Sequence, residues 1–155
     1  MTAPVRPTID TLRWRDVDVL AYKQDPGVPF RDVTRQVLFD DPALACQLRY
    51  FEVAPGGHTT LERHEHAHAV MIQRGRGRLL LGSRVFEVRE HDLVHVPALT
   101  WHQFRAAPDA PLGFLCMVNA VRDRPQLPSP DDVERLRALP EVARFLDDRD
   151  GPPAA

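Results

Sequence analysis

The feature that most constrains the fold is a series of short apolar runs that begins at Val37. Val, Leu, Phe and Tyr predominate in these runs, and segments rich in Pro, Gly and Asp separate them, such as Pro55-Gly56-Gly57 and Gly82-Ser83. Strands at such close and regular spacing are typical of a sandwich or a closed barrel and argue against crossover helices. The strands that we expect are 37–39, 45–53, 59–64, 68–74, 77–81, 84–88, 92–96, 102–105 and 112–119.

The C-terminal region holds the only convincing helical pattern. Ser129 can cap a helix, Pro130 suits its first turn, and Val133, Leu136 and Leu139 recur at helical spacing. A proline then interrupts the pattern, and a second short helix can follow. We expect these helices to pack on the barrel and cover an edge or an end.

These patterns divide the chain into three parts. Residues 1–36 are predicted to form an irregular segment that packs on the barrel, residues 37–120 the barrel itself, and residues 121–155 a helical extension with a loose tail. A length of 155 residues suits one compact domain of this kind.

Composition argues against several classes of function. A net charge of -2 provides no field that would recruit nucleic acid or an acidic membrane, and no apolar run approaches the length of a membrane span. The first residues lack the apolar region of a secretory signal. Cys46 and Cys116 each lie in an apolar run, where a free cysteine behaves as a small buried hydrophobe. We therefore expect a cytoplasmic protein with no nucleic-acid or membrane partner.

Three of the seven histidines crowd into the hexapeptide Arg63-His64-Glu65-His66-Ala67-His68. A solvated polar strand face would account for this alternation by itself. His102 favours another interpretation, because it follows a different apolar strand, and histidines from two strands of one small barrel can supply several ligands to a metal. Residues four apart on a straight strand are roughly 13 Å apart, so His64 and His68 can share an ion only if the chain reverses between them.

With these histidines the sequence resembles the cupin superfamily over roughly residues 51–118. The first cupin motif ends in a metal ligand, six residues and a glycine, as His68 and Gly75 do here, and its opening turn is similar to Pro55-Gly56-Gly57. The resemblance implies an all-β fold, the cupin-type double-stranded β-helix or jelly-roll barrel, and a homodimer.

The second cupin motif resembles the segment that contains Pro97 and His102. The chain departs from the family at two glycine positions of this motif, which are occupied here by His91 and Leu99, and at its final Asn, which is replaced by Ala106.

The resemblance places four metal ligands at Glu62, His64, His68 and His102. Cupins commonly carry His, His, Glu and His at these positions, so the chain keeps three imidazoles and one carboxylate with the carboxylate moved. His66 would lie in the turn and is the alternative to Glu62. Such a set suits one divalent transition metal ion, with Fe, Mn, Ni, Co, Cu and Zn all left open.

Strand alternation predicts a mostly apolar pocket for a small organic molecule. Its expected lining is Phe51, Val70, Ile72 and Phe104, and Arg49, in phase with Phe51, would orient an anionic substrate. We therefore expect a metal-dependent enzyme, either a dioxygenase, as the resemblance implies, or a Lewis-acid lyase or isomerase. The alternative is a non-catalytic cupin that senses or carries a metal or a small ligand.

Overall fold

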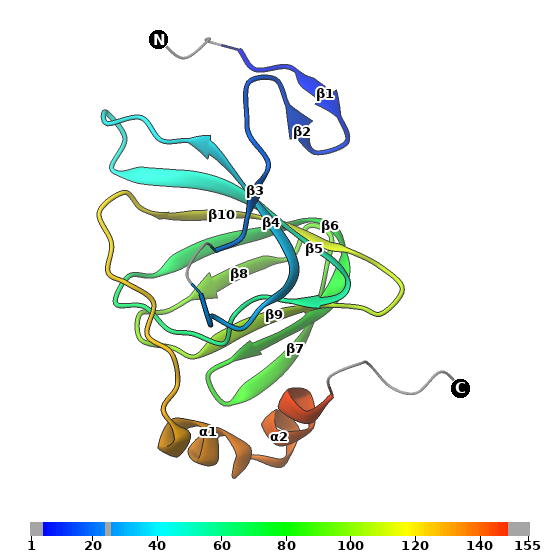
Figure 1. The fold of residues 1–155 in the computed structure, drawn as a ribbon, viewed down its shortest axis with the longest axis vertical. Coiled ribbons are helices and arrows are strands. Elements are labelled where there is room, and N and C mark those ends of the chain that lie inside the picture. The colour runs from blue at the N-terminus through cyan, green and yellow to red at the C-terminus, as the bar shows by residue number, and fades with distance from the viewer. Residues whose placement is uncertain (1–4, 24–25, 149–155) are drawn as a thin grey trace.

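The computed structural model describes residues 5–23 and 26–148 and consists mainly of β-strands that close into a barrel (Figure 1). The strands are β1 (Thr8–Asp10), β2 (Arg13–Trp14), β3 (Leu20–Ala21), β4 (Arg31–Phe39), β5 (Cys46–His58), β6 (His68–Leu81), β7 (Arg84–Arg89), β8 (Leu93–Val96), β9 (His102–Ala106) and β10 (Leu112–Asn119), and the helices are α1 (Pro130–Arg137) and α2 (Pro140–Asp147).

Strand β10 closes the barrel, because it pairs with both β5 and β6. On the other side of the ring, β9 pairs with β6 over its whole length and with β5 through His58 and Arg105. Strand β4 extends the sheet beyond β5, and β7 and β8 pair with the two halves of β6. This arrangement confirms the predicted all-β, cupin-type fold.

The long strand β6 changes partners at Gly75. Residues 68–71 pair with β8, whereas residues 76–81 pair with β7. Gly75 has a φ of 71°, and a Cβ atom at this position would lie 1.8 Å from the carbonyl oxygen of Pro111. The sequence predicted two strands here, and the structure joins them because glycine lets the chain bend without ending the strand.

Other predicted strands also differ from the structure, and β5 continues to His58, beyond the predicted end at residue 53. Strand β4 begins at Arg31, so residues 31–36, expected to be irregular, pair with β5; the polar Arg35 and Gln36 obscured the alternation in the sequence. The predicted strand 59–64 is irregular instead. There the Thr59 hydroxyl accepts a hydrogen bond from the Phe104 backbone N–H, which replaces a bond to a strand carbonyl.

The barrel interior contains an aromatic layer beneath the histidine-rich region. The ring of Phe114 lies 4.5 Å from that of Phe104 and 5.4 Å from that of Phe51, measured between centroids. All three side chains are buried, and they line the same cavity as the clustered histidines.

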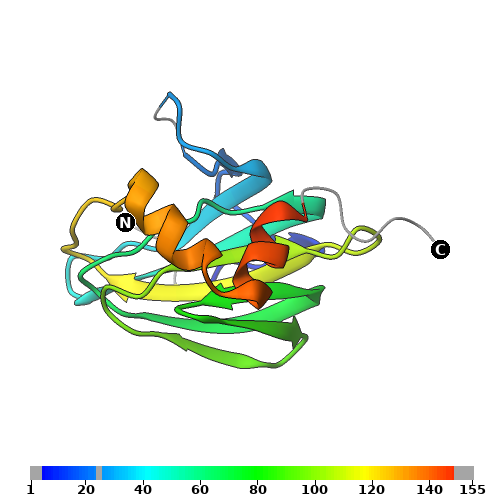
Figure 2. The ribbon, with the colours of Figure 1, turned by 90° about the horizontal axis from the view of Figure 1, so that it is seen from below.

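The two C-terminal helices form as predicted, and they lie next to each other on one side of the barrel (Figure 2). The Ser129 hydroxyl accepts a hydrogen bond from the Asp132 N–H and caps α1. Val142 and Phe145 of α2 are buried against Leu80 of β6. Each helix has eight residues, and within the described ranges none is long and apolar enough to cross a membrane.

Candidate metal centre and ligand pocket

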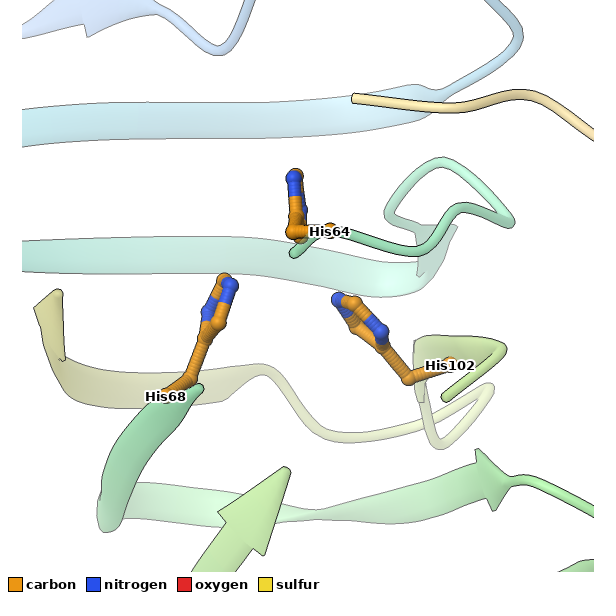
Figure 3. A group of neighbouring side chains, drawn as sticks. All are labelled: His64, His68 and His102. Atoms are coloured by element: carbon orange, nitrogen blue, oxygen red, sulfur yellow. The ribbon is translucent and has the colours of Figure 1, made fainter. Parts of the chain in front are cut away.

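Three histidines from three segments of the chain converge in the barrel. His64 lies in the irregular segment after β5, His68 begins β6 and His102 begins β9. One ring nitrogen from each lies within 4.8 Å of the others, and Figure 3 shows the three rings grouped around a common space. A cluster of three imidazoles with this spacing can hold a metal ion.

Backbone hydrogen bonds between separate segments hold the histidines in place. Leu99 N–H donates to the His64 carbonyl at 2.6 Å. The chain bends at Glu65 and His66, so the ring centroids of His64 and His68 are 4.8 Å apart. The reversal predicted between His64 and His68 is therefore present as a bend, and the described strand pairings include no hairpin between these two residues.

Several ring nitrogens of the cluster have no hydrogen-bond partner. His102 Nδ1 donates to the Thr100 carbonyl at 2.9 Å, which leaves its Nε2 as the lone-pair nitrogen. Among the described residues, His68 Nε2 and His64 Nδ1 are buried without a hydrogen-bond partner, and His64 Nε2 has only the Glu62 carboxylate, 3.3 Å away, beside it. Buried polar atoms are rarely left unsatisfied, so these nitrogens fit a metal ion.

Burial also keeps the imidazoles of His68 and His102 neutral. It lowers the pKa of His68 to about 2 and that of His102 to about 4. Both rings are therefore unprotonated at neutral pH, which is the form that can bind a metal.

Glu62 lies beside the three histidines with its carboxylate shared among several groups. Its Oε1 is 3.3 Å from His64 Nε2 and accepts a hydrogen bond from the Tyr22 hydroxyl at 3.3 Å, while Oε2 pairs with Lys23. Burial alone would raise the pKa of Glu62, but His64 and Lys23 outweigh it and hold the pKa at about 2. Glu62 is thus a carboxylate at neutral pH, adjacent to the cluster.

His66 has a different environment. Its ring stacks on His68 at 5.0 Å, and its Nδ1 donates to Asp123 Oδ1 at 2.6 Å. Nitrogens of His64 and His66 and a carboxylate oxygen of Asp123 form a second group within 4.8 Å. Both metal-capable groups in the described part of the chain contain His64.

A cavity of about 460 Å³ opens next to the histidine cluster, within the usual range of small-molecule pockets. Of the residues predicted to line a substrate pocket, Arg49, Phe51, Val70 and Phe104 lie at this cavity. Ile72, which was expected with them, is fully buried in the core and does not reach the cavity. A smaller cavity of about 280 Å³ contains none of the clustered histidines.

The cavity also contains residues that the sequence analysis did not assign to it. They include Tyr22, Lys23, Arg35, Cys116 and Arg122. The first three come from segments expected to be irregular, so no strand pattern predicted their positions.

Cys116 is the buried thiol of this pocket. Its Sγ is 3.3 Å from His68 Nδ1, and burial raises its pKa to about 12. Along β10 it alternates with the buried Leu112, Phe114 and Val118, and that alternation is the signal that could have placed it on the inner face.

The comparisons with known proteins agree with this geometry. The Cupin domain family matches residues 49–118. The chain is 58% identical over 144 residues to 1-methylthio-D-xylulose 5-phosphate methylsulfurylase from Rhodospirillum rubrum, covering 93% of this chain and 92% of that protein.

Two crystal structures are similar over nearly the whole chain. A cupin 2 conserved barrel domain protein from Rhodopseudomonas palustris has 55% sequence identity and a TM-score of 0.86, covering 91% of this chain and 97% of that one. A cupin-2 domain protein from Rhodospirillum rubrum has 57% identity and a TM-score of 0.85, covering 96% of this chain and 100% of the other. With the fold and the histidine cluster described above, this extent of likeness shows that the chain belongs to the cupin superfamily.

Proposed function

We propose that this protein is a metal-dependent cupin enzyme that removes the methylthio group from 1-methylthio-D-xylulose 5-phosphate. The relative named for this substrate is 58% identical over 93% of the chain. The observation that carries the proposal is the position of Cys116, a thiol that lines the same cavity as the three histidines and lies 3.3 Å from His68. A thiol next to a metal-binding cluster suits transfer of a methylthio group.

His64, His68 and His102 would hold one divalent transition metal ion, with Glu62 as the fourth ligand and Fe, Mn, Ni, Co, Cu and Zn as candidates. Two ligand atoms that bind one ion with bonds of about 2.1 Å lie roughly 3 Å apart. Glu62 Oε1 is 3.3 Å from His64 Nε2, so the two atoms are spaced as ligands of one ion. We favour Glu62 over His66 because the backbone bridge to His102 ties Glu62 to the cluster, whereas His66 groups with His64 and Asp123 instead of with His68 and His102. When bound, the ion supplies Lewis-acid chemistry that stabilises negative charge on a substrate oxygen.

Cys116 would act as the nucleophile toward the methylthio sulfur. Its sulfur forms an S–S bond with that sulfur, the C–S bond breaks, and its electron pair stays on the adjacent carbon of the ketose. That carbon neighbours the ketone, so the charge delocalises onto oxygen, and a proton then completes the new C–H bond. Burial keeps the Cys116 sulfur protonated at neutral pH, so its proton is released as the S–S bond forms and balances the proton that the carbon takes up. Cys116 is left as a methyl disulfide, which a small external thiol releases by exchange.

The direct test is turnover of 1-methylthio-D-xylulose 5-phosphate by purified, metal-loaded protein with dithiothreitol, followed by ³¹P NMR and mass spectrometry. We expect the 1-deoxy ketose phosphate to form equally well without oxygen. An oxygen requirement would replace the proposal with dioxygenase chemistry. Binding of the intact substrate without turnover at any of the candidate metals would support the non-catalytic sensor or carrier.

The free thiols also bear on compartment and assembly. Cys46 and Cys116 are both unpaired, and a nucleophilic thiol needs a reducing environment, so we propose that the enzyme acts in the cytoplasm. The homodimer implied by the cupin resemblance stays a prediction, and sedimentation equilibrium would test it.

A further inference from the structure

Two arginines that line the cavity each have a buried guanidinium nitrogen with no hydrogen-bond partner among the described residues. Arg49 of β5 and Arg35 of β4 both line the cavity. Arg49 Nη2 and Arg35 Nε are buried and make no hydrogen bond to any described residue. Arg49 Nε donates to Gln47 Oε1 at 2.5 Å, which fixes the orientation of its guanidinium group. Leaving a charged donor buried and unpaired is costly, so the arrangement favours a bound anion.

The carboxylates of the cavity do not neutralise these arginines. Glu62 pairs with Lys23, and Asp123 accepts hydrogen bonds from His66 and from the Glu65 N–H. Burial, followed by the positive charge of Arg122, lowers the pKa of Arg49 to about 10, so Arg49 keeps its charge at neutral pH. The charges available to a ligand at this side of the cavity are therefore positive.

Strand register places the arginines and the histidine cluster on opposite sides of Cys116. Arg49 lies directly opposite Cys116 in the pairing of β5 with β10, and Cys116 lies opposite Val70 in the pairing of β10 with β6. Strand β6 begins with His68, and β4, which carries Arg35, lies beyond β5. An elongated ligand with its anionic end at β4 and β5 would therefore pass over Cys116 and reach the histidines.

The geometry points to a phosphate-binding subsite formed by Arg35 and Arg49, with Arg122 at its rim, which binds the phosphate of the ketose and places the methylthio end over Cys116. Arginine suits this role because its planar fork of donors matches phosphate oxygens. Arg122 is exposed, and its Nη1 donates to the Asn119 and Ala120 carbonyls, which holds it near the cavity mouth. The identity of the substrate rests on the proposed function, whereas the subsite requires only a phosphate monoester.

The test compares D-xylulose 5-phosphate with D-xylulose as probes, using isothermal titration calorimetry on metal-loaded protein. The variants are Arg49→Met, Arg35→Met and the conservative Arg49→Lys, with the exposed Arg89→Met as matched control. We expect the wild type and Arg89→Met to prefer the phosphorylated probe. Each Met variant should weaken binding of that probe by at least about tenfold and leave D-xylulose binding unchanged, because a charged hydrogen bond is lost. Arg49→Lys should retain part of the preference.

Metal content and thermal melting show whether each variant is folded, and Arg35→Met keeps the test open if Arg49→Met unfolds. A full preference for the phosphorylated probe in both folded Met variants would overturn the subsite. The proposed function fails separately: arginine-dependent binding of D-xylulose 5-phosphate without turnover of the methylthio substrate would leave the subsite in place and remove the reaction. Turnover of the methylthio substrate at the wild-type rate in both Met variants would support the reaction and remove the phosphate subsite.

Discussion

Glu62 and His102 face each other across a pair of backbone hydrogen bonds, with Glu62 N–H donating to the His102 carbonyl at 3.2 Å and His102 N–H to the Glu62 carbonyl at 3.0 Å. This isolated bridge ties the irregular segment after β5 to the start of β9. It fixes the Glu62 side chain next to the cluster independently of any bound ion. His66 has no such connection to β9 in the described strand pairings, and it lies in the bend.

The first prediction follows from this bridge. If Glu62 is the fourth ligand, as proposed, Glu62→Ala should lower metal affinity by at least about 10- to 100-fold, whereas the matched variant His66→Ala should keep near-stoichiometric metal. Metal analysis after dialysis against a weak chelator measures both. Loss of metal in His66→Ala with retention in Glu62→Ala would assign the fourth position to His66.

Two residues at glycine positions of the second cupin motif keep the backbone conformation that glycine favours. His91 has a φ of 74° and Leu99 a φ of 56°. A left-handed conformation costs a non-glycine residue roughly 1–2 kcal/mol, partly offset by the greater freedom of unfolded glycine. Leu99→Gly should therefore raise the free energy of unfolding by about 0.5 kcal/mol in urea denaturation.

Leu93→Gly is the control for this prediction. Leu93 is exposed like Leu99 but lies in the regular strand β8, where glycine should lower the free energy of unfolding by about 1 kcal/mol. Equal destabilisation by both substitutions would show that the positive φ of Leu99 carries no energetic cost.

The barrel and the bend at Gly75 show which parts of the fold the sequence could predict and which it could not. Turn signals and strand alternation predicted a sandwich or a closed barrel, and the resemblance to cupins selected the barrel and predicted that His64, His68 and His102 would lie together. The bend at Gly75 could not be placed within one strand, because it depends on the approach of Pro111 from the β9–β10 loop. Local alternation is therefore visible in the sequence, whereas contacts between distant segments are not.

The residues that line the cavity also divide into those that local alternation predicts and those placed by contacts between distant segments. Arg49 and Phe51 were predicted from alternation along one strand. Lys23 was not, since its position depends on how the N-terminal segment crosses the barrel and reaches Glu62 through a contact 39 residues apart in the sequence. Cys116 lay within reach of the strand pattern but was interpreted only as a core residue.

Gly75→Ala should be strongly destabilising. A Cβ atom would lie 1.8 Å from the Pro111 carbonyl oxygen, and φ is also positive, so we expect a loss of more than about 2 kcal/mol in the free energy of unfolding. Gly56→Ala serves as control, because Gly56 has a similar φ of 75° but open space around its Cβ position. It should cost only about 1 kcal/mol, and the difference between the two measures the steric clash.

The metal-free protein should lose stability as pH falls below 6.5. Burial lowers the pKa of His68 and His102 from 6.5 to about 2 and about 4, so below pH 6.5 the unfolded chain binds protons that the folded chain does not. Each such histidine decreases the free energy of unfolding by about 1.4 kcal/mol per pH unit. Denaturation of chelator-treated protein between pH 7 and pH 5 avoids the titration of Glu62, whose contribution is lost only at lower pH.

The double variant His68→Asn, His102→Asn should flatten that pH dependence. His58 and His66, whose pKa values burial also lowers, remain and would sustain a residual slope. An unchanged slope in the double variant would mean that neither of the two cluster histidines is held neutral in the folded metal-free protein.

The two cysteines offer a matched pair for the proposed reaction. Cys116 lines the cavity, whereas Cys46 is half-buried at the start of β5 and lies outside it. Cys116→Ser should reduce turnover by at least about a thousandfold because a hydroxyl cannot form the S–S bond, while Cys46→Ser should turn over at the wild-type rate.

Without an external thiol, wild-type protein should stop after one turnover with a CH₃S group on Cys116, which peptide mass spectrometry detects. Metal content should be unchanged in Cys116→Ser, because in the proposed site His68 would bind the metal through Nε2, and the thiol faces Nδ1. Undiminished turnover by a metal-loaded Cys116→Ser protein would exclude the thiol mechanism, even if the phosphate preference of the cavity remained.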